Sequence, residues 1–259
     1  MIPEMPDRLL IGGCSFTDSP NNLQALKADP CGWVSNLVLK YPQIRFINNV
    51  AISGGGTHAM VQNLSYMLSG TNWFPPEKTL VLFDITGLER VDLMVSEQHP
   101  DRNDFSHVNI TLPFAWITSG GWFGPDHIKD FRSPLTGLRT GHSKAMIDEL
   151  QKNQEYEQVV LDNSLGVMNL IMSLAHRGYR YYFMIMDDQV LQDAPDFFQK
   201  FLDGQDQHWI KFDPYLSMFA YTRALSMLDT DQFHPSRQGH VKIAERIAQT
   251  VDHHFVELY

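Results

Sequence analysis

One run of apolar residues constrains the fold more than any other part of the sequence. Residues 79–85 (TLVLFDI) are almost continuously apolar, and the run is as long as an ordinary strand. Such a run is typical of a strand in a parallel sheet whose two faces are both covered by helices, because neither face of the strand then meets water. We therefore expect residues 79–85 to form a central strand of a buried parallel sheet.

The rest of the sequence alternates between strand-like and helix-like patterns. Short apolar runs predict further strands at residues 8–13, 45–51 and 181–186. Helical patterns are found at residues 33–39, near His58, at about 143–177 and at about 236–253. The alternation favours an α/β fold in which a parallel sheet lies between two layers of helices, a three-layer α/β/α sandwich. Because 259 residues, 43% of them hydrophobic, can bury a full core, we expect a single domain over residues 1–259.

The stretch of residues 97–140 interrupts this alternation. It is rich in Gly, Pro, Trp and Asn and has one convincing extended run, at residues 108–117. We interpret it as an insertion that shapes a pocket. Its aromatic residues either form a platform for a sugar ring or pack beneath a long loop; they include Trp116, Trp122 and Phe123.

The charge of the chain argues against several classes of partner. Lys and Arg number 20 against 30 Asp and Glu, a formal net charge of -10, so nucleic acid and anionic membranes are disfavoured. The first residues (MIPEMPDRLLIGG) lack the basic and apolar segments of a signal peptide. No apolar stretch approaches the roughly 20 residues that a membrane-spanning helix needs. We expect a soluble protein that is cytoplasmic or associated with a virus particle.

The cysteines and histidines indicate neither a disulfide scaffold nor a metal site. Cys14 and Cys31 are the two cysteines, and they lack the paired spacing of zinc ligands. Four scattered histidines also lack the spacing of metal ligands: His58, His99, His107 and His127. We expect no bound metal, and a reducing compartment fits the cysteines best.

A serine near one end of the sequence and an Asp–His pair near the other have the residue types of a nucleophilic site. Ser15 lies in GGCSFT, directly after a predicted strand, where small residues allow a sharp turn that exposes a side chain. Asp231 precedes His234 by three residues, close enough on a turn for the carboxylate to accept a hydrogen bond from the imidazole. A serine hydroxyl needs such an oriented base to become a nucleophile. The sequence does not have the Gly-x-Ser-x-Gly elbow of α/β-hydrolases, because Thr17 occupies the last glycine position.

Three segments together resemble the sequence blocks of the SGNH (GDSL-like) hydrolases. They are residues 13–17 (GCSFT), 49–54 (NVAISG) and 231–235 (DQFHP), which resemble the first, second and fifth blocks in the same order. The segment that begins at His234 is the most specific, because it continues into a pattern similar to the closing helix of that family.

The resemblance implies a flavodoxin-like α/β/α sandwich and ester hydrolysis through an acyl-enzyme. In that family the residue matching Ser15 attacks the ester, the residue matching His234 transfers the proton, and the residue matching Asp231 orients the imidazole. The resemblance also implies that the backbone N–H groups of Ser15 and Gly54, with a side chain from the third block, hold the oxyanion. No metal or cofactor is implied.

The sequence departs from the family pattern at two places. Where the third block has Gly-x-Asn-Asp, this chain has residues 84–87 (DITG), so we expect Thr86 or a neighbour to replace the asparagine amide. Loss of one oxyanion donor costs on the order of 10²–10³ in turnover, part of which a Thr86 hydroxyl would recover. Cys14 replaces the usual aspartate of the first block. Near the same strand end, Asp84 and Arg90 either contact substrate or form a structural ion pair.

Two functions fit these observations. The first is a serine esterase that removes a small acyl group, such as acetate, from a small-molecule or carbohydrate ester. The second is a non-catalytic SGNH-like binding or structural module of a larger assembly such as a virus particle, favoured by the missing third-block asparagine. A hydrogen-bonded chain of Ser15, His234 and Asp231 that faces an open pocket would favour the first. Attack by Cys14 is disfavoured, because two adjacent residues of a turn cannot both face His234.

Overall fold

The central sheet of the protein is parallel, as the sequence predicts. The computed structural model describes residues 6–17, 19–20, 22–52, 55–70, 73–95, 115–119 and 155–257. Within these ranges four parallel strands pair in the order β2-β1-β3-β6. Their bounds are Arg8–Gly12 (β1), Phe46–Asn49 (β2), Thr79–Ile85 (β3) and Arg180–Ile185 (β6). Because β6 is the fourth strand of this sheet in chain order, the strand order is 2-1-3-4, which is the order of the flavodoxin-like doubly wound folds.

Isolated parallel bridges extend the sheet beyond β6. Phe183 pairs with Trp209 and Ile185 pairs with Ser217. The N–H of Ile210 donates a hydrogen bond of 2.8 Å to the carbonyl of Phe183. The segment after β6 thus occupies the next position in the sheet.

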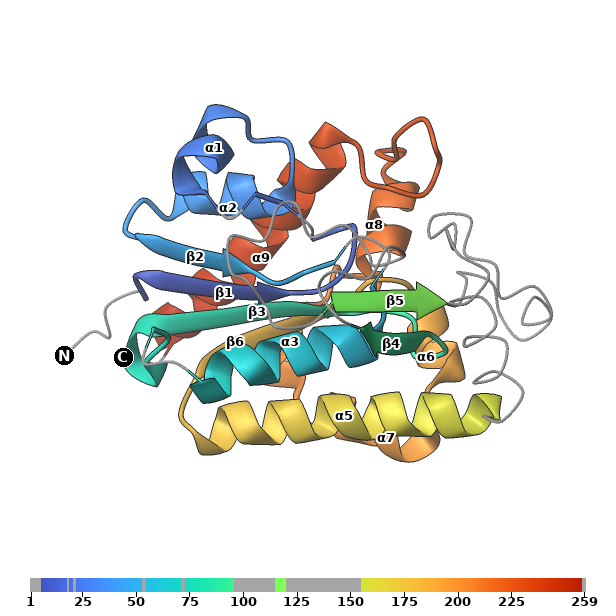
Figure 1. Cartoon of the computed structure of the whole chain (residues 1–259). Helices are drawn as coiled ribbons and strands as arrows, with labels where there is room; N and C mark the ends of the chain where they lie inside the picture. The colour runs from blue at the N-terminus through green and yellow to red at the C-terminus, as the bar shows by residue number, and fades with distance from the viewer. Residues whose placement is uncertain are drawn as a thin grey trace.

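Helices cover both faces of this sheet (Figure 1). On one side lie α1, α2, α8 and α9, and on the other side lie α3, α5 and α7. The helices are α1 (Leu23–Ala28), α2 (Trp33–Lys40), α3 (Thr57–Gly70), α5 (Tyr156–His176), α6 (Gln189–Asp193), α7 (Asp196–Asp203), α8 (Met218–Ala224) and α9 (Arg237–Glu257), with 3₁₀ turns at η1 (Pro76–Lys78) and η3 (Asp206–His208). The three-layer α/β/α arrangement is therefore confirmed.

Alternate residues of each strand supply two separate cores. From β3, Val81 and Phe83 pack on the side of α3 and α5, whereas Leu80 and Leu82 pack on the side of α2 and α9. All seven residues of β3 are buried. This two-sided burial is the physical reason that residues 79–85 are almost continuously apolar.

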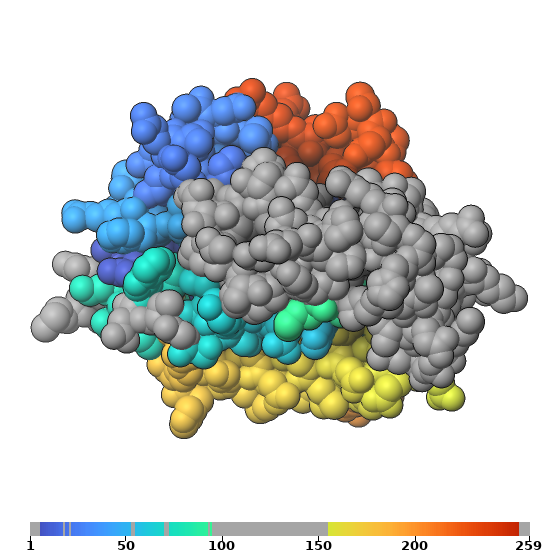
Figure 2. All heavy atoms as spheres, viewed as in Figure 1, coloured from blue at the N-terminus to red at the C-terminus, as the bar shows by residue number. Residues whose placement is uncertain are grey.

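Segments far apart in the sequence lie together in the layer above the sheet. Figure 2 shows the blue N-terminal and red C-terminal segments next to each other at the top of the molecule. Helices α2 and α9 are in contact there, and the Tyr41 hydroxyl after α2 donates a 2.7 Å hydrogen bond to Asp252 of α9. This contact brings the residues before α9 toward the turn after β1.

A short antiparallel pair follows β3. It consists of β4 (Val91–Val95) and β5 (Ala115–Ser119). Asp92 of β4 accepts hydrogen bonds from the N–H groups of Gly56 (3.0 Å) and Ala59 (2.9 Å), so its carboxylate caps the start of α3. Of the predicted insertion at residues 97–140, β5 is the described part; Trp122 and Phe123 lie outside the described residues.

Helix α5 has the length and composition of a membrane-spanning helix, with a mean hydropathy of 1.2 over 18 residues. Its side chains Val167, Leu170 and Leu174 nevertheless belong to the core beneath the sheet. Core helices of soluble proteins pass the same test of length and composition. The described part of the chain therefore contains no clear membrane-spanning segment.

Candidate active site

Ser15 lies in a tight turn at the carboxyl end of β1. The turn is closed by a hydrogen bond of 2.9 Å from the N–H of Thr17 to the carbonyl of Cys14. Gly13, just before it, has φ +152°, and a Cβ atom there would lie 1.4 Å from an oxygen of the Asp84 carboxylate. Glycine is thus required at position 13, since no side chain fits between the turn and β3. Ser15 itself is half-buried.

Asp231 and His234 share one turn between α8 and α9. The Oδ1 atom of Asp231 accepts hydrogen bonds of 2.9 Å from the N–H groups of both Phe233 and His234. Gln232 adopts a left-handed φ of +61°, and the N–H of Asp229 donates a 2.8 Å hydrogen bond to the His234 carbonyl. The turn therefore places the Asp231 carboxylate beside the imidazole through its own backbone.

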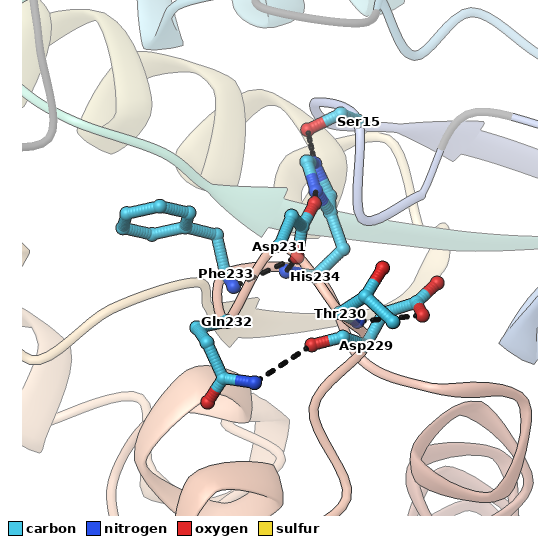
Figure 3. Close-up of polar contacts among 7 residues, drawn as sticks. All are labelled: Ser15, Asp229, Thr230, Asp231, Gln232, Phe233 and His234. Carbon is cyan, nitrogen blue, oxygen red and sulfur yellow. Dashed lines mark hydrogen bonds and ion pairs between the residues drawn. The ribbon is translucent and has the colours of Figure 1, made fainter.

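The three predicted catalytic side chains form one hydrogen-bonded chain (Figure 3). His234 Nδ1 lies 2.5 Å from Asp231 Oδ2, and His234 Nε2 lies 2.9 Å from Ser15 Oγ. An ionised carboxylate only accepts hydrogen bonds, so the pairing with Asp231 places the imidazole proton on Nδ1. Nε2 is then the unprotonated nitrogen, which can accept the hydroxyl proton of Ser15 as general-base catalysis requires.

The electrostatics of the turn keep Asp231 charged. Partial burial acts to raise the pKa of Asp231, but hydrogen bonds from the His234 side chain and from the N–H groups of Phe233 and His234 outweigh it and lower the pKa to about 2. The Asp231 side chain is 46% exposed and that of His234 is 29% exposed. Behind the imidazole, the buried ring of Phe16 lies 5.4 Å from that of His234, centroid to centroid. The base is therefore supported on one side and open to solvent on the other.

Of the two predicted oxyanion residues, the structure describes Thr86. Gly54 lies outside the described residues. Thr86 is fully buried, and its Oγ1 lies 3.3 Å from Oγ1 of Thr57, whose hydroxyl also donates a 3.1 Å hydrogen bond to the Thr86 carbonyl. These contacts tie the end of β3 to the first residue of α3. The oxyanion roles of Gly54 and Thr86 stay predictions.

Asp84 and Arg90 are both buried at the carboxyl end of β3. Arg90 Nη1 donates a 2.8 Å hydrogen bond to the carbonyl of Gly55, before α3. Asp84 lies under the Ser15 turn, where the Cys14 thiol is 3.3 Å from its Oδ2 atom. Sequence reasoning missed this contact; the signal for it was that Cys14 and Asp84 both stand at the ends of predicted strands.

A small pocket opens at the carboxyl ends of β3 and β6. Met186 is one of its walls, and the Met186 sulfur lies 3.0 Å from the Cys14 sulfur, one residue from Ser15. The pocket is lined by Gly87, Glu89, Arg90, Met186, Asp187, Gln189 and Val190. Among the described residues no group of three or more His, Cys, Asp or Glu side chains is arranged to hold a metal ion.

Comparisons with known proteins find likeness in structure alone. No family model and no curated protein matches the sequence. The chain is similar to the psychrotrophic esterase EstA from Pseudoalteromonas sp. (13% identity, TM-score 0.49, 95% of this chain and 97% of that one). It is also similar to a catalytic mutant of the acetylxylan esterase Axe2 from Geobacillus stearothermophilus (12%, 0.49, 97% and 96%) and to a lipolytic G-D-S-L family member from Veillonella parvula (13%, 0.46, 93% and 96%). At such identities and TM-scores, the chemistry of this site has to be derived from its own residues.

Proposed function

We propose that this protein is an SGNH-type serine hydrolase that cleaves carboxylic esters, with Ser15 as nucleophile, His234 as general base and acid, and Asp231 as the group that orients the imidazole. The observation that carries the proposal is the continuous hydrogen-bonded chain from Asp231 Oδ2 through His234 to Ser15 Oγ. The resemblance of the three sequence segments to the SGNH blocks supports the same assignment.

The reaction follows from these contacts. Ser15 Oγ attacks the ester carbonyl carbon while its proton passes to His234 Nε2, and the Nδ1 proton stays in its hydrogen bond to Asp231. The tetrahedral intermediate collapses, the C–O bond to the alcohol breaks, and Nε2 gives its proton to the departing alkoxide. Water then attacks the acyl-enzyme with its proton taken by Nε2, and the second collapse returns that proton to Ser15 and releases the carboxylic acid. Acid, base and nucleophile are thus all regenerated.

The proposed substrate is a small acyl ester, such as an acetyl ester, of a carbohydrate. The partial exposure of His234 and Asp231 suits an acyl group carried on a bulky alcohol that stays outside the protein. Phe233, 43% exposed and next to His234, points its ring away from Ser15 (Figure 3) and offers an apolar surface to a sugar ring.

The test of the chemistry is covalent labelling by a fluorophosphonate probe together with turnover of p-nitrophenyl acetate. In Ser15→Ala and His234→Ala we expect labelling to disappear and turnover to fall by at least about 10³-fold. In Asp231→Asn we expect a loss on the order of 10³–10⁴, because an amide cannot hold the imidazole proton on Nδ1. Acetylated sugars and p-nitrophenyl esters of longer acids then define the acyl and alcohol groups.

Two matched variants control for unspecific effects. Ser69→Ala and His176→Ala remove an exposed serine and an exposed histidine on α3 and α5, and both are expected to react like the wild type. Circular dichroism and thermal melting establish that every variant is folded. A folded wild type that neither takes up the probe nor turns over any ester would overturn the proposal in favour of a non-catalytic binding module.

A further inference from the structure

A buried carboxylate lies directly beneath the nucleophile turn. Asp84 is fully buried at the end of β3, which pairs with β1 so that Gly12 stands opposite Phe83. Its carboxylate occupies the space where a side chain at position 13 would be, 1.4 Å from an ideal Cβ. A charged group is costly in such a place unless it is hydrogen-bonded, so its presence calls for a reason.

The residues on both sides of Ser15 are held by buried contacts. The Cys14 thiol donates to Asp84 Oδ2 at 3.3 Å. The indole N–H of Trp33 donates to Thr17 Oγ1 at 3.2 Å. The Asn49 amide holds the carbonyl of Thr17 at 2.7 Å. The turn is therefore anchored immediately before Ser15 and two residues after it.

We propose that Asp84 is a positioning residue for the nucleophile: by filling the space beneath Gly13 and accepting a hydrogen bond from Cys14, its carboxylate sets the turn that aims Ser15 Oγ at His234 Nε2. This inference rests on the proposed esterase function and concerns the same site. Asp84 touches no reacting atom in this reading. A displacement of about 1 Å at a reacting group can cost 10²-fold in rate, so the hold on the turn matters for catalysis.

The ionisation of Asp84 gives this role a pH dependence. Burial raises the pKa of Asp84 to about 6, although the neighbouring Thr17 and Cys14 groups act to lower it. The nearby titratable and charged groups are the Cys14 thiol and the Arg90 guanidinium. Burial and the Asp84 charge raise the pKa of Cys14, whereas Arg90 lowers it. The residue after β6, Met186, is uncharged and also contacts Cys14. Below about pH 6 Asp84 becomes protonated and loses part of its capacity to accept.

The test compares the wild type with Asp84→Asn, which keeps the shape of the side chain and removes its charge. The rate of labelling by the fluorophosphonate probe is measured between pH 4.5 and 8, with thermal melting at each pH. We expect labelling at pH 7.5 to be about 10- to 100-fold slower in a variant that melts no lower than the wild type. We also expect the rate to fall less steeply with decreasing pH in Asp84→Asn than in the wild type, because protonation of Asp84 no longer contributes to the fall.

A second pair of variants keeps the inference testable if Asp84→Asn does not fold. Cys14→Ala removes the thiol that donates to Asp84 and is expected to slow labelling, whereas Cys14→Ser keeps a donor at this position and is expected to be slowed less. Wild-type rates and an unchanged acidic limb in Asp84→Asn, or equal rates in the two Cys14 variants, would overturn the role of Asp84 while leaving the esterase intact. A wild type that is not labelled overturns the proposed function and this inference with it.

Discussion

The contact between Gly13 and Asp84 leads to a quantitative prediction for Gly13→Ala. An alanine Cβ would lie 1.4 Å from Asp84 Oδ1, 2.5 Å from Asp84 Cγ and 3.0 Å from Thr17 Cβ. None of these atoms is the far end of a long flexible side chain. Alanine would also have to adopt φ +152°, in a region that side chains rarely occupy. Both the close approach to Asp84 and the required φ therefore destabilise the Gly13→Ala variant.

The two costs can be estimated separately. The backbone conformation costs about 1–3 kcal/mol for a residue with a side chain. Overpacking of a buried site costs about 1–3 kcal/mol more. We expect the free energy of unfolding to fall by about 2–6 kcal/mol, and the melting temperature to fall on the order of 5 to 20 °C for a chain of this size.

The assay is urea unfolding followed by tryptophan fluorescence, with Gly178→Ala as the matched control. Gly178 also has a left-handed φ, +73°, but an added Cβ there meets no atom within 4 Å. Gly178→Ala therefore carries only the backbone cost, about 1–2 kcal/mol. The double variant Gly13→Ala with Asp84→Ala removes the collision and is expected to show a coupling energy of at least about 1 kcal/mol. A Gly13→Ala variant no less stable than Gly178→Ala, with no coupling to Asp84, would refute the close approach.

Three further predictions concern stability and reactivity. Asp92→Ala removes the acceptor for two N–H groups at the start of α3 and is expected to cost about 1–2 kcal/mol by urea unfolding, whereas Asp92→Asn keeps an acceptor oxygen and costs less. Burial, with the nearby His234 charge, lowers the pKa of His240 to about 4. Between pH 6.5 and 4 the unfolded chain therefore binds a proton at His240 that the folded chain does not, and the free energy of unfolding falls as the pH drops through this range. The His240→Gln variant should lose less stability over the same range. A thiol reagent should modify exposed Cys31 in the folded protein and buried Cys14 only after unfolding, so a count of two reactive thiols without denaturant would contradict the burial of Cys14.

The strands of the sheet could be predicted from sequence because each is a short apolar run with clear limits. Residues 79–85 match β3 in full, and the other predicted strands overlap β1, β2 and β6. Strand β2 ends at Asn49, two residues before the predicted limit. There the Asn49 side chain accepts a hydrogen bond from the Ala51 N–H and donates to the Thr17 carbonyl, which links the end of β2 to the Ser15 turn.

The site was predictable where its geometry is local or matched a known pattern. Asp231 and His234 lie three residues apart on one turn, so their spacing alone indicated the pairing. The partnership with Ser15 rested on the resemblance, because no local pattern relates residues separated by 219 positions. The contact of Cys14 with Asp84 depends on the pairing of β1 with β3, and periodicity shows that a strand is buried without showing which strand lies beside it.

The long separation of nucleophile and base also bears on how the protein folds. Asp231 and His234 can adopt their turn through contacts within a few residues, whereas Ser15 is one member of a hydrogen bond that closes a loop of 219 residues. Contacts of such high sequence separation form late, since the entropy of closing the loop is lost before the contact stabilises anything. A refolding chain that has paired β1 with β3 but has not yet docked α9 on α2 holds a serine without its base. Recovery of ester hydrolysis during refolding should therefore lag behind recovery of secondary structure.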